Sequence, residues 1–192
     1  MNRMILLAGA AALSLSLAAC GKPAEDTDMA ASPPPVAVAP VTVPAAGEST
    51  SPDFVGRAAD SDMFEIESSK VALERTKNAE VKAFAQMMIE MHTRTSADLK
   101  QAVADSGLAI TPPPTLPDDK QAIIASLKAT DAAGFDKAYM DAQIDGHQAT
   151  LDLMTRYSQT GDNAVLKAAA TKTAPIVQEH LTKAKAIRDA LM

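Results

Sequence analysis

Residues 81–99 constrain the fold more than any other stretch, because their apolar residues recur with the period of a helix. Steps of three and four residues place the large side chains on one helical face. That face consists of Val81, Phe84, Met88, His92, Thr95 and Leu99. Such a helix is not stable alone, so its apolar face must be covered by partner helices. The segment therefore predicts a helical bundle with a histidine on an inward face.

The first 19 residues are predicted to be a bacterial lipoprotein signal peptide. Their apolar stretch, residues 5–19, is shorter than the about 20 residues that a membrane span needs. The sequence LAAC at residues 17–20 resembles the lipobox of such peptides, which implies cleavage before Cys20 and acylation of this cysteine. An ordinary cleaved signal peptide with an incidental cysteine is the alternative. Gly21 resembles the pattern sorted to the outer membrane, so we expect a lipid-anchored protein there, facing the periplasm.

Residues 20–52 contain many prolines, alanines and small polar residues, and they predict a disordered tether behind the acylated Cys20. Cys20 is the only cysteine, which leaves the folded part without disulfides. The net charge of −6 and the absence of a basic tract argue against a nucleic-acid partner. Contact with the membrane should therefore run through the lipid anchor. The sequence does not identify a protein partner.

The remaining residues, 53–192, predict an all-α domain, since aromatic residues are scarce and no alternating β-branched runs occur. Asn78 and Gly161 mark two tight turns, whereas the proline-rich connection at 107–131 is long. Two antiparallel hairpins joined by one long crossover form the connectivity of a ferritin-like four-helix bundle. The expected helices cover about residues 53–77, 79–106, 132–159 and 162 to the C-terminus, with a short extra helix from 118. Ser51, Asn78, Thr130 or Asp131, and Asp162 are the expected helix starts.

Four sequence motifs resemble a bacterial family called domain of unknown function 4142. They are MFEIESSKVAL, EVKAFAQMMIEMHT, FDKAYMDAQIDGHQ and a final P-x-x-x-x-HL, in order along residues 54–191. The resemblance implies a ferritin-like fold in an envelope protein without an established biochemical role. The family often has Asp before its first two histidines, but Met91 and Gly146 stand there in this chain.

Each of the last three long helices carries one histidine on its apolar face, near its centre. These are His92, His147 and His180, and Glu65 holds the corresponding place in the first helix. Helices of about 25 residues are some 37 Å long, so side chains at their centres can meet at one level. The sequence therefore predicts a shared polar layer with one side chain from each helix.

This layer has two main interpretations. Three imidazoles and a carboxylate could hold one divalent transition metal such as Zn, Fe or Cu. Alternatively, the layer is structural, with Tyr139, Gln143 and His147 forming a hydrogen-bonded ladder at four-residue spacing. Unrelated histidines, a response to pH, and a copper site using Met88 and Met91 are further alternatives. Di-iron chemistry is disfavoured, because no helix has a Glu-x-x-His motif.

No phosphate loop, nucleophile elbow or paired-carboxylate motif occurs, which favours a protein that is non-enzymatic or whose activity the sequence does not reveal. The sequence thus predicts a lipid-anchored envelope protein whose helical domain is a structural or interaction module. A mononuclear metal-binding protein using the same polar layer is the alternative.

Overall fold

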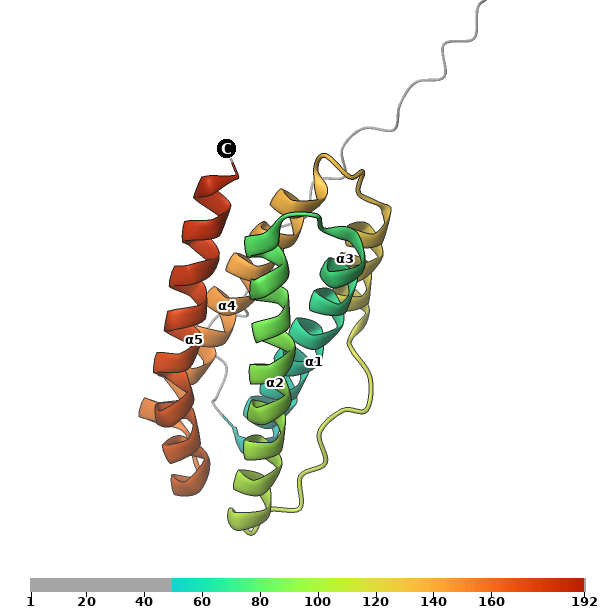
Figure 1. The fold of residues 1–192 in the computed structure, drawn as a ribbon. Helices are drawn as coiled ribbons and strands as arrows, with labels where there is room; N and C mark the ends of the chain where they lie inside the picture. Colours follow the sequence, from blue (N-terminus) through green and yellow to red (C-terminus); the bar gives the residue numbers. More distant parts are fainter. Residues whose placement is uncertain (1–49, 192) are drawn as a thin grey trace, which may run out of the picture. The chain divides into compact units, whose positions relative to one another are not determined.

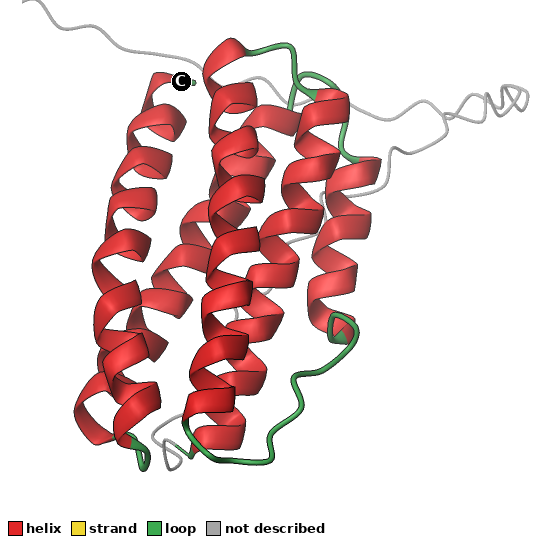
Figure 2. Cartoon of the chain, turned by 60° about the horizontal axis from the view of Figure 1, so that its bottom comes forward, coloured by secondary structure: helices red, strands yellow, loops and turns green. Residues whose placement is uncertain are grey.

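The computed structural model describes residues 50–191, which form five helices and no strand (Figures 1 and 2). The predicted signal peptide, Cys20 and most of the tether lie outside the described residues. The prediction of an all-α domain is confirmed. The helices are α1 (Ser51–Arg75), α2 (Ala79–Asp105), α3 (Asp118–Ala129), α4 (Phe135–Thr160) and α5 (Ala164–Ala190).

The tight turn between α1 and α2 forms as predicted, because Asn78 caps α2. Its side-chain oxygen accepts hydrogen bonds from the backbone N–H groups of Glu80 and Val81. Gly107 follows the end of α2 with φ of 72°, the left-handed conformation that favours glycine after a helix. These local signals fix the lengths of the first hairpin's helices.

The predicted starts of the other long helices are wrong by one to three residues. Thr50, not Ser51, caps α1, and Asn163 caps α5 one residue after Asp162. Helix α4 begins at Phe135 after Gly134, whose backbone N–H donates to the Asp131 side chain. Ser51 and Asp162 instead bond to each other through their side chains. Tertiary contact therefore takes up two polar residues that local chemistry would assign to caps.

The four long helices form two antiparallel hairpins, α1 with α2 and α4 with α5, which pack against each other (Figure 1). Helix α1 lies against α4, and α2 lies against α5. The long connection after α2 includes α3, which packs against α1 and α4. This is the crossover connectivity predicted from the contrast between short and long loops.

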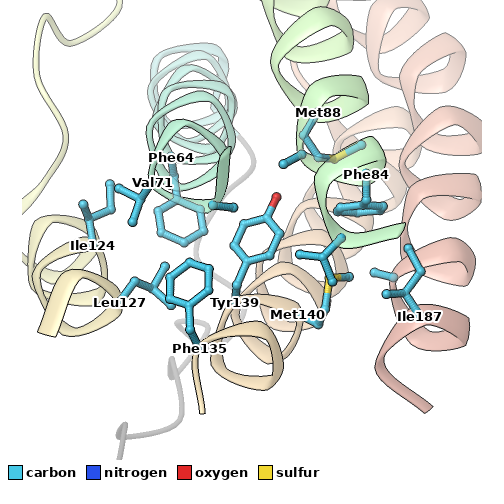
Figure 3. Close-up of a cluster of buried hydrophobic side chains, with 14 residues drawn as sticks. Phe64, Val71, Phe84, Met88, Ile124, Leu127, Phe135, Tyr139, Met140 and Ile187 are labelled. Carbon is cyan, nitrogen blue, oxygen red and sulfur yellow. The ribbon is translucent and has the colours of Figure 1, made fainter. Parts of the chain in front are cut away.

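Two apolar clusters fill the bundle, one toward each end. The first contains Phe64, Phe84, Tyr139 and side chains of α3 (Figure 3). The second lies around Tyr157, whose ring stacks on Phe54 with centroids 3.9 Å apart. Full burial of each large apolar side chain contributes about 1.5–3 kcal/mol to folding. The predicted polar side chains lie between the two clusters.

Within residues 50–191, none of the helices combines the length and the apolar character that crossing a membrane requires.

Candidate metal centre

Three imidazole rings meet in the centre of the bundle, one each from α2, α4 and α5. The ring centroids are 5.6 Å apart for His92 and His147, 5.7 Å for His92 and His180, and 5.5 Å for His147 and His180. One nitrogen of each ring lies within 4.8 Å of the other two, and all three side chains are buried. The structure thus places the three predicted histidines at one level.

One ring nitrogen of His92 is hydrogen-bonded to a residue outside the three-histidine cluster. Its Nδ1 lies 2.8 Å from Oδ1 of Asp62, a buried carboxylate on α1. Asp62 also accepts hydrogen bonds from the hydroxyl groups of Thr95, at 2.7 Å, and Ser96, at 3.2 Å. A carboxylate accepts hydrogen bonds, so Nδ1 of His92 donates and Nε2 keeps its lone pair in the neutral ring.

His147 is held in the same way, by the backbone. Its Nδ1 donates to the carbonyl oxygen of Gln143 at 2.8 Å, one helical turn earlier. Three buried nitrogens then have no hydrogen-bond partner among the described residues: Nε2 of His92, Nε2 of His147 and Nδ1 of His180. Histidines that bind metals usually donate their other ring nitrogen to a carboxylate or a carbonyl. His92 and His147 show this arrangement.

The surroundings keep two of these imidazoles neutral at pH 7. Burial lowers the pKa of His147 to about 4, and the neighbouring His92 lowers it further while the Gln143 carbonyl opposes the shift. Burial also lowers the pKa of His180 to about 3, together with the nearby His147 and His92. A neutral imidazole offers the lone pair that a metal needs.

Glu65 is buried near His92 and His147 but does not belong to the three-histidine cluster. Its Oε1 lies 3.6 Å from Nδ1 of His147, the nitrogen that already donates to Gln143. Burial raises the pKa of Glu65 to about 7, although His92 nearby opposes the shift. The predicted four-residue layer therefore becomes three imidazoles with a carboxyl group behind one of them.

The predicted ladder of Tyr139, Gln143 and His147 is wrong, because the first two side chains bond across to α1. The hydroxyl of Tyr139 lies 2.8 Å from that of Ser69, and Nε2 of Gln143 donates to Ser68 at 3.1 Å. The Gln143 backbone, not its side chain, supports His147. These contacts between helices were not evident from spacing within one helix.

Asp62 is the residue of this candidate site that the sequence analysis did not single out. It lies three residues before Glu65 in α1, close to the same helical face. A carboxylate among alanines and serines on an inward face was the available signal, because buried acids need partners. The structure gives it three, on α2.

Comparison with known proteins identifies the family of this chain. No curated protein and no solved structure is significantly similar to this chain. A family model described as "Domain of unknown function (DUF4142)" matches residues 36–187, which include all three histidines, Asp62 and Glu65. The match covers most of the 192 residues. The chain therefore belongs to the DUF4142 family.

Proposed function

We propose that the helical domain binds one divalent transition-metal ion through His92, His147 and His180. Two observations carry this proposal: one nitrogen of each ring lies within 4.8 Å of a nitrogen of the other two rings, and each ring has a buried nitrogen with no hydrogen-bond partner among the described residues. An unpaired buried polar group costs about 1–3 kcal/mol. A metal ion would supply all three nitrogens with a partner at once.

The set of donor atoms restricts which metal ions can bind. Three imidazoles suit Zn, Cu, Fe or Ni, and a site with three histidines keeps one coordination position open for another ligand. At Zn–N distances of about 2.0–2.1 Å, nitrogens in a tetrahedral site lie about 3.4 Å apart. The present limit of 4.8 Å means that metal binding draws the rings closer together.

A purely structural role for the polar layer explains less of this arrangement than metal binding does. The bonds from Ser61 to Thr150 and from Ser69 to Tyr139 already join α1 to α4. These satisfied pairs can set the helix register without the histidines. The polar pairs on α1 therefore act as the structural element, and the histidine triangle is left for binding.

Zinc titration of the full chain, stripped by a chelator, tests the proposal. We expect one Zn²⁺ per chain and a higher melting temperature with zinc, because the ion binds only the folded state. The variants His92→Ala, His147→Ala and His180→Ala should each lose stoichiometric binding while remaining helical. Ser61→Ala changes a buried polar residue outside the triangle and should retain it. A wild-type chain that takes up no metal would refute the proposal.

We also propose that Cys20 carries lipid and holds the domain at the outer membrane, facing the periplasm. The support is the lipobox-like sequence LAAC at residues 17–20 and the apolar stretch before it. Several acyl chains, at about 0.8 kcal/mol per buried methylene, anchor a protein firmly. The variant Cys20→Ser should release the protein from the membrane fraction, and globomycin should block processing of the precursor. Unchanged processing under globomycin would exclude the lipid anchor.

A further inference from the structure

A cavity of about 250 Å³ runs between α2 and α5 and ends at the histidine layer. Its inner end is formed by Asp62 and His92, which bond to each other. Its outer end is lined by exposed side chains, among them Asp98, Asp105 and Lys172. The cavity thus connects solvent with the ring of a candidate metal ligand.

The cavity approaches the histidine layer on all three helices that carry it. Thr95 lies three residues after His92, and Thr150 lies three residues after His147. Val177 lies three residues before His180 on α5, which runs the opposite way. Residues three apart are neighbours on one helical face. The cavity therefore reaches His92 itself and ends about one helical turn from His147 and His180.

The interface between α2 and α5 is a suitable place for such a passage. These two helices pack on each other less extensively than the helices within either hairpin. The volume of 250 Å³ is several times the about 30 Å³ of one water molecule, so a hydrated ion fits. The exposed pair of Asp98 and Lys172, 3.9 Å apart, lies at its mouth. A carboxylate there attracts a cation, and the lysine opposes it.

A second cavity offers no comparable route. It has about 310 Å³ and lies between α3 and α4, with Lys120, Ala138 and Gly146 in its wall. Gly146 places it next to Glu65 rather than next to the free imidazole nitrogens. None of the three histidines lines it.

We infer that a divalent metal ion reaches the three histidines through the cavity between α2 and α5, passing Asp98 at the mouth and Asp62 at the inner end. This inference rests on the proposed metal binding. In this route, the exposed residues at the mouth control the rate at which the metal ion enters, and they do not set the affinity of the three histidines for it.

The rate of Zn²⁺ uptake by the chelator-stripped full chain tests the route, measured by stopped flow with a chromophoric zinc chelator as competitor. The variant Ala169→Phe places a large ring in the cavity wall and should slow uptake at least about tenfold. Its equilibrium affinity should change little, because release slows as well. The matched control Ala138→Phe fills the other cavity and should leave the uptake rate unchanged.

A charge reversal at the mouth provides an independent variant that leaves the core untouched. Lys172→Glu should speed uptake by about two- to fivefold at low salt, and the gain should vanish at high salt. Lys185→Glu makes the same charge change at an exposed position of α5 that does not line the cavity. It should have a smaller effect.

The outcomes separate the route from the site. If wild type binds one Zn²⁺ at equilibrium but Ala169→Phe and Lys172→Glu load at the rates of their controls, the route is wrong and the metal centre stands. If wild type binds no zinc at equilibrium, both inferences fail. Should Ala169→Phe fail to fold, the comparison of Lys172→Glu with Lys185→Glu decides the question by itself.

Discussion

Nδ1 of His92 lies 2.8 Å from Oδ1 of Asp62, so a carboxylate on α1 orients an imidazole on α2. The contact joins the two helices of the first hairpin at the level of the histidine layer. It also occupies one nitrogen of a ring whose centroid lies 5.6 Å from that of His147 and 5.7 Å from that of His180. The two residues are 30 positions apart, and the tight turn at Asn78 brings them together.

Replacing Asp62 with Asn should weaken zinc binding by about tenfold to a hundredfold, the usual cost of losing a carboxylate behind a metal-binding histidine. The amide oxygen still accepts a hydrogen bond, but it no longer supplies negative charge to the ring. Competition titration of the purified full chain with a zinc chelator measures the change. Asp98→Asn removes the same charge from the surface and should leave the equilibrium affinity within about threefold. Equal affinities for the two variants would contradict the role of Asp62.

Gly146 should tolerate alanine only when the Glu65 side chain is shortened. A Cβ at position 146 would lie 2.8 Å from Oε1 of Glu65, which is buried and must move. Alanine also gains about 1 kcal/mol over glycine within a helix. We expect Gly146→Ala to destabilise the wild type by about 1–2 kcal/mol and to stabilise Glu65→Ala by about 1 kcal/mol. Urea unfolding of the metal-free chains measures both.

The critical result is whether Gly146→Ala lowers the free energy of unfolding of the wild type and raises that of Glu65→Ala. Gly56→Ala provides the control, because nothing lies within 4 Å of a Cβ at that position of α1. It should raise the free energy of unfolding by about 1 kcal/mol in both backgrounds. If Gly146→Ala behaves like this control in the wild type, Glu65 does not press on position 146.

Glu65 should make the stability of the metal-free protein depend on pH in the direction opposite to the histidines. Its pKa is raised from 4.5 to about 7, so the folded state binds the proton more tightly than the unfolded chain. This group's contribution is full below pH 4.5 and is lost as the pH rises to about 7. The shift corresponds to a change of about 3 kcal/mol.

For His147 the pKa is lowered from 6.5 to about 4, so the unfolded chain binds the proton first on acidification. Its contribution is present above pH 6.5 and is lost as the pH falls toward 4. Removing the opposing group with Glu65→Gln should therefore steepen the loss of stability between pH 6.5 and pH 4.5. Urea unfolding across this range checks it. Glu67→Gln, at an exposed position of α1, should leave the wild-type profile unchanged. Identical slopes for both variants would contradict the account.

Tyr139→Phe should destabilise the protein by about 1–2 kcal/mol, because it leaves the buried hydroxyl of Ser69 without its 2.8 Å partner. The ring itself stays packed among Phe84, Phe135 and their neighbours (Figure 3). Adding Ser69→Ala should recover most of the loss, since neither partner is then unsatisfied. Thermal unfolding of the two single variants and the double variant measures the coupling. Additive losses would show that the two hydroxyl groups do not act as a pair.

The sequence predicted the features that depend on local chemistry and on helical period. Asn78 at a helix start and Gly107 after a helix end predicted the first hairpin. The prolines between α2 and α3 predicted the crossover. The period of the apolar residues placed His92 and His147 on inward faces. Their common level then followed from the similar lengths of the helices.

Contacts between helices could not be predicted from local chemistry and helical period. The partners of Tyr139 and Gln143 are serines on α1, and small polar residues give no periodic signal of their own. The choice between Asp62 and Glu65 as the acid nearest a donor nitrogen depends on the rotation of α1 about its axis. A difference of three residues leaves both on one face, so sequence spacing cannot separate them.

X-ray absorption at the zinc edge, on the loaded full chain, tests the central claim most directly, because it reports the donor atoms themselves. The account predicts three imidazole nitrogens at about 2.0–2.1 Å, with the multiple scattering of histidine rings, and the same spectrum for Glu65→Gln. A first shell made only of oxygen atoms, or a shell with fewer than three imidazoles, would contradict the assignment of His92, His147 and His180 as the metal ligands.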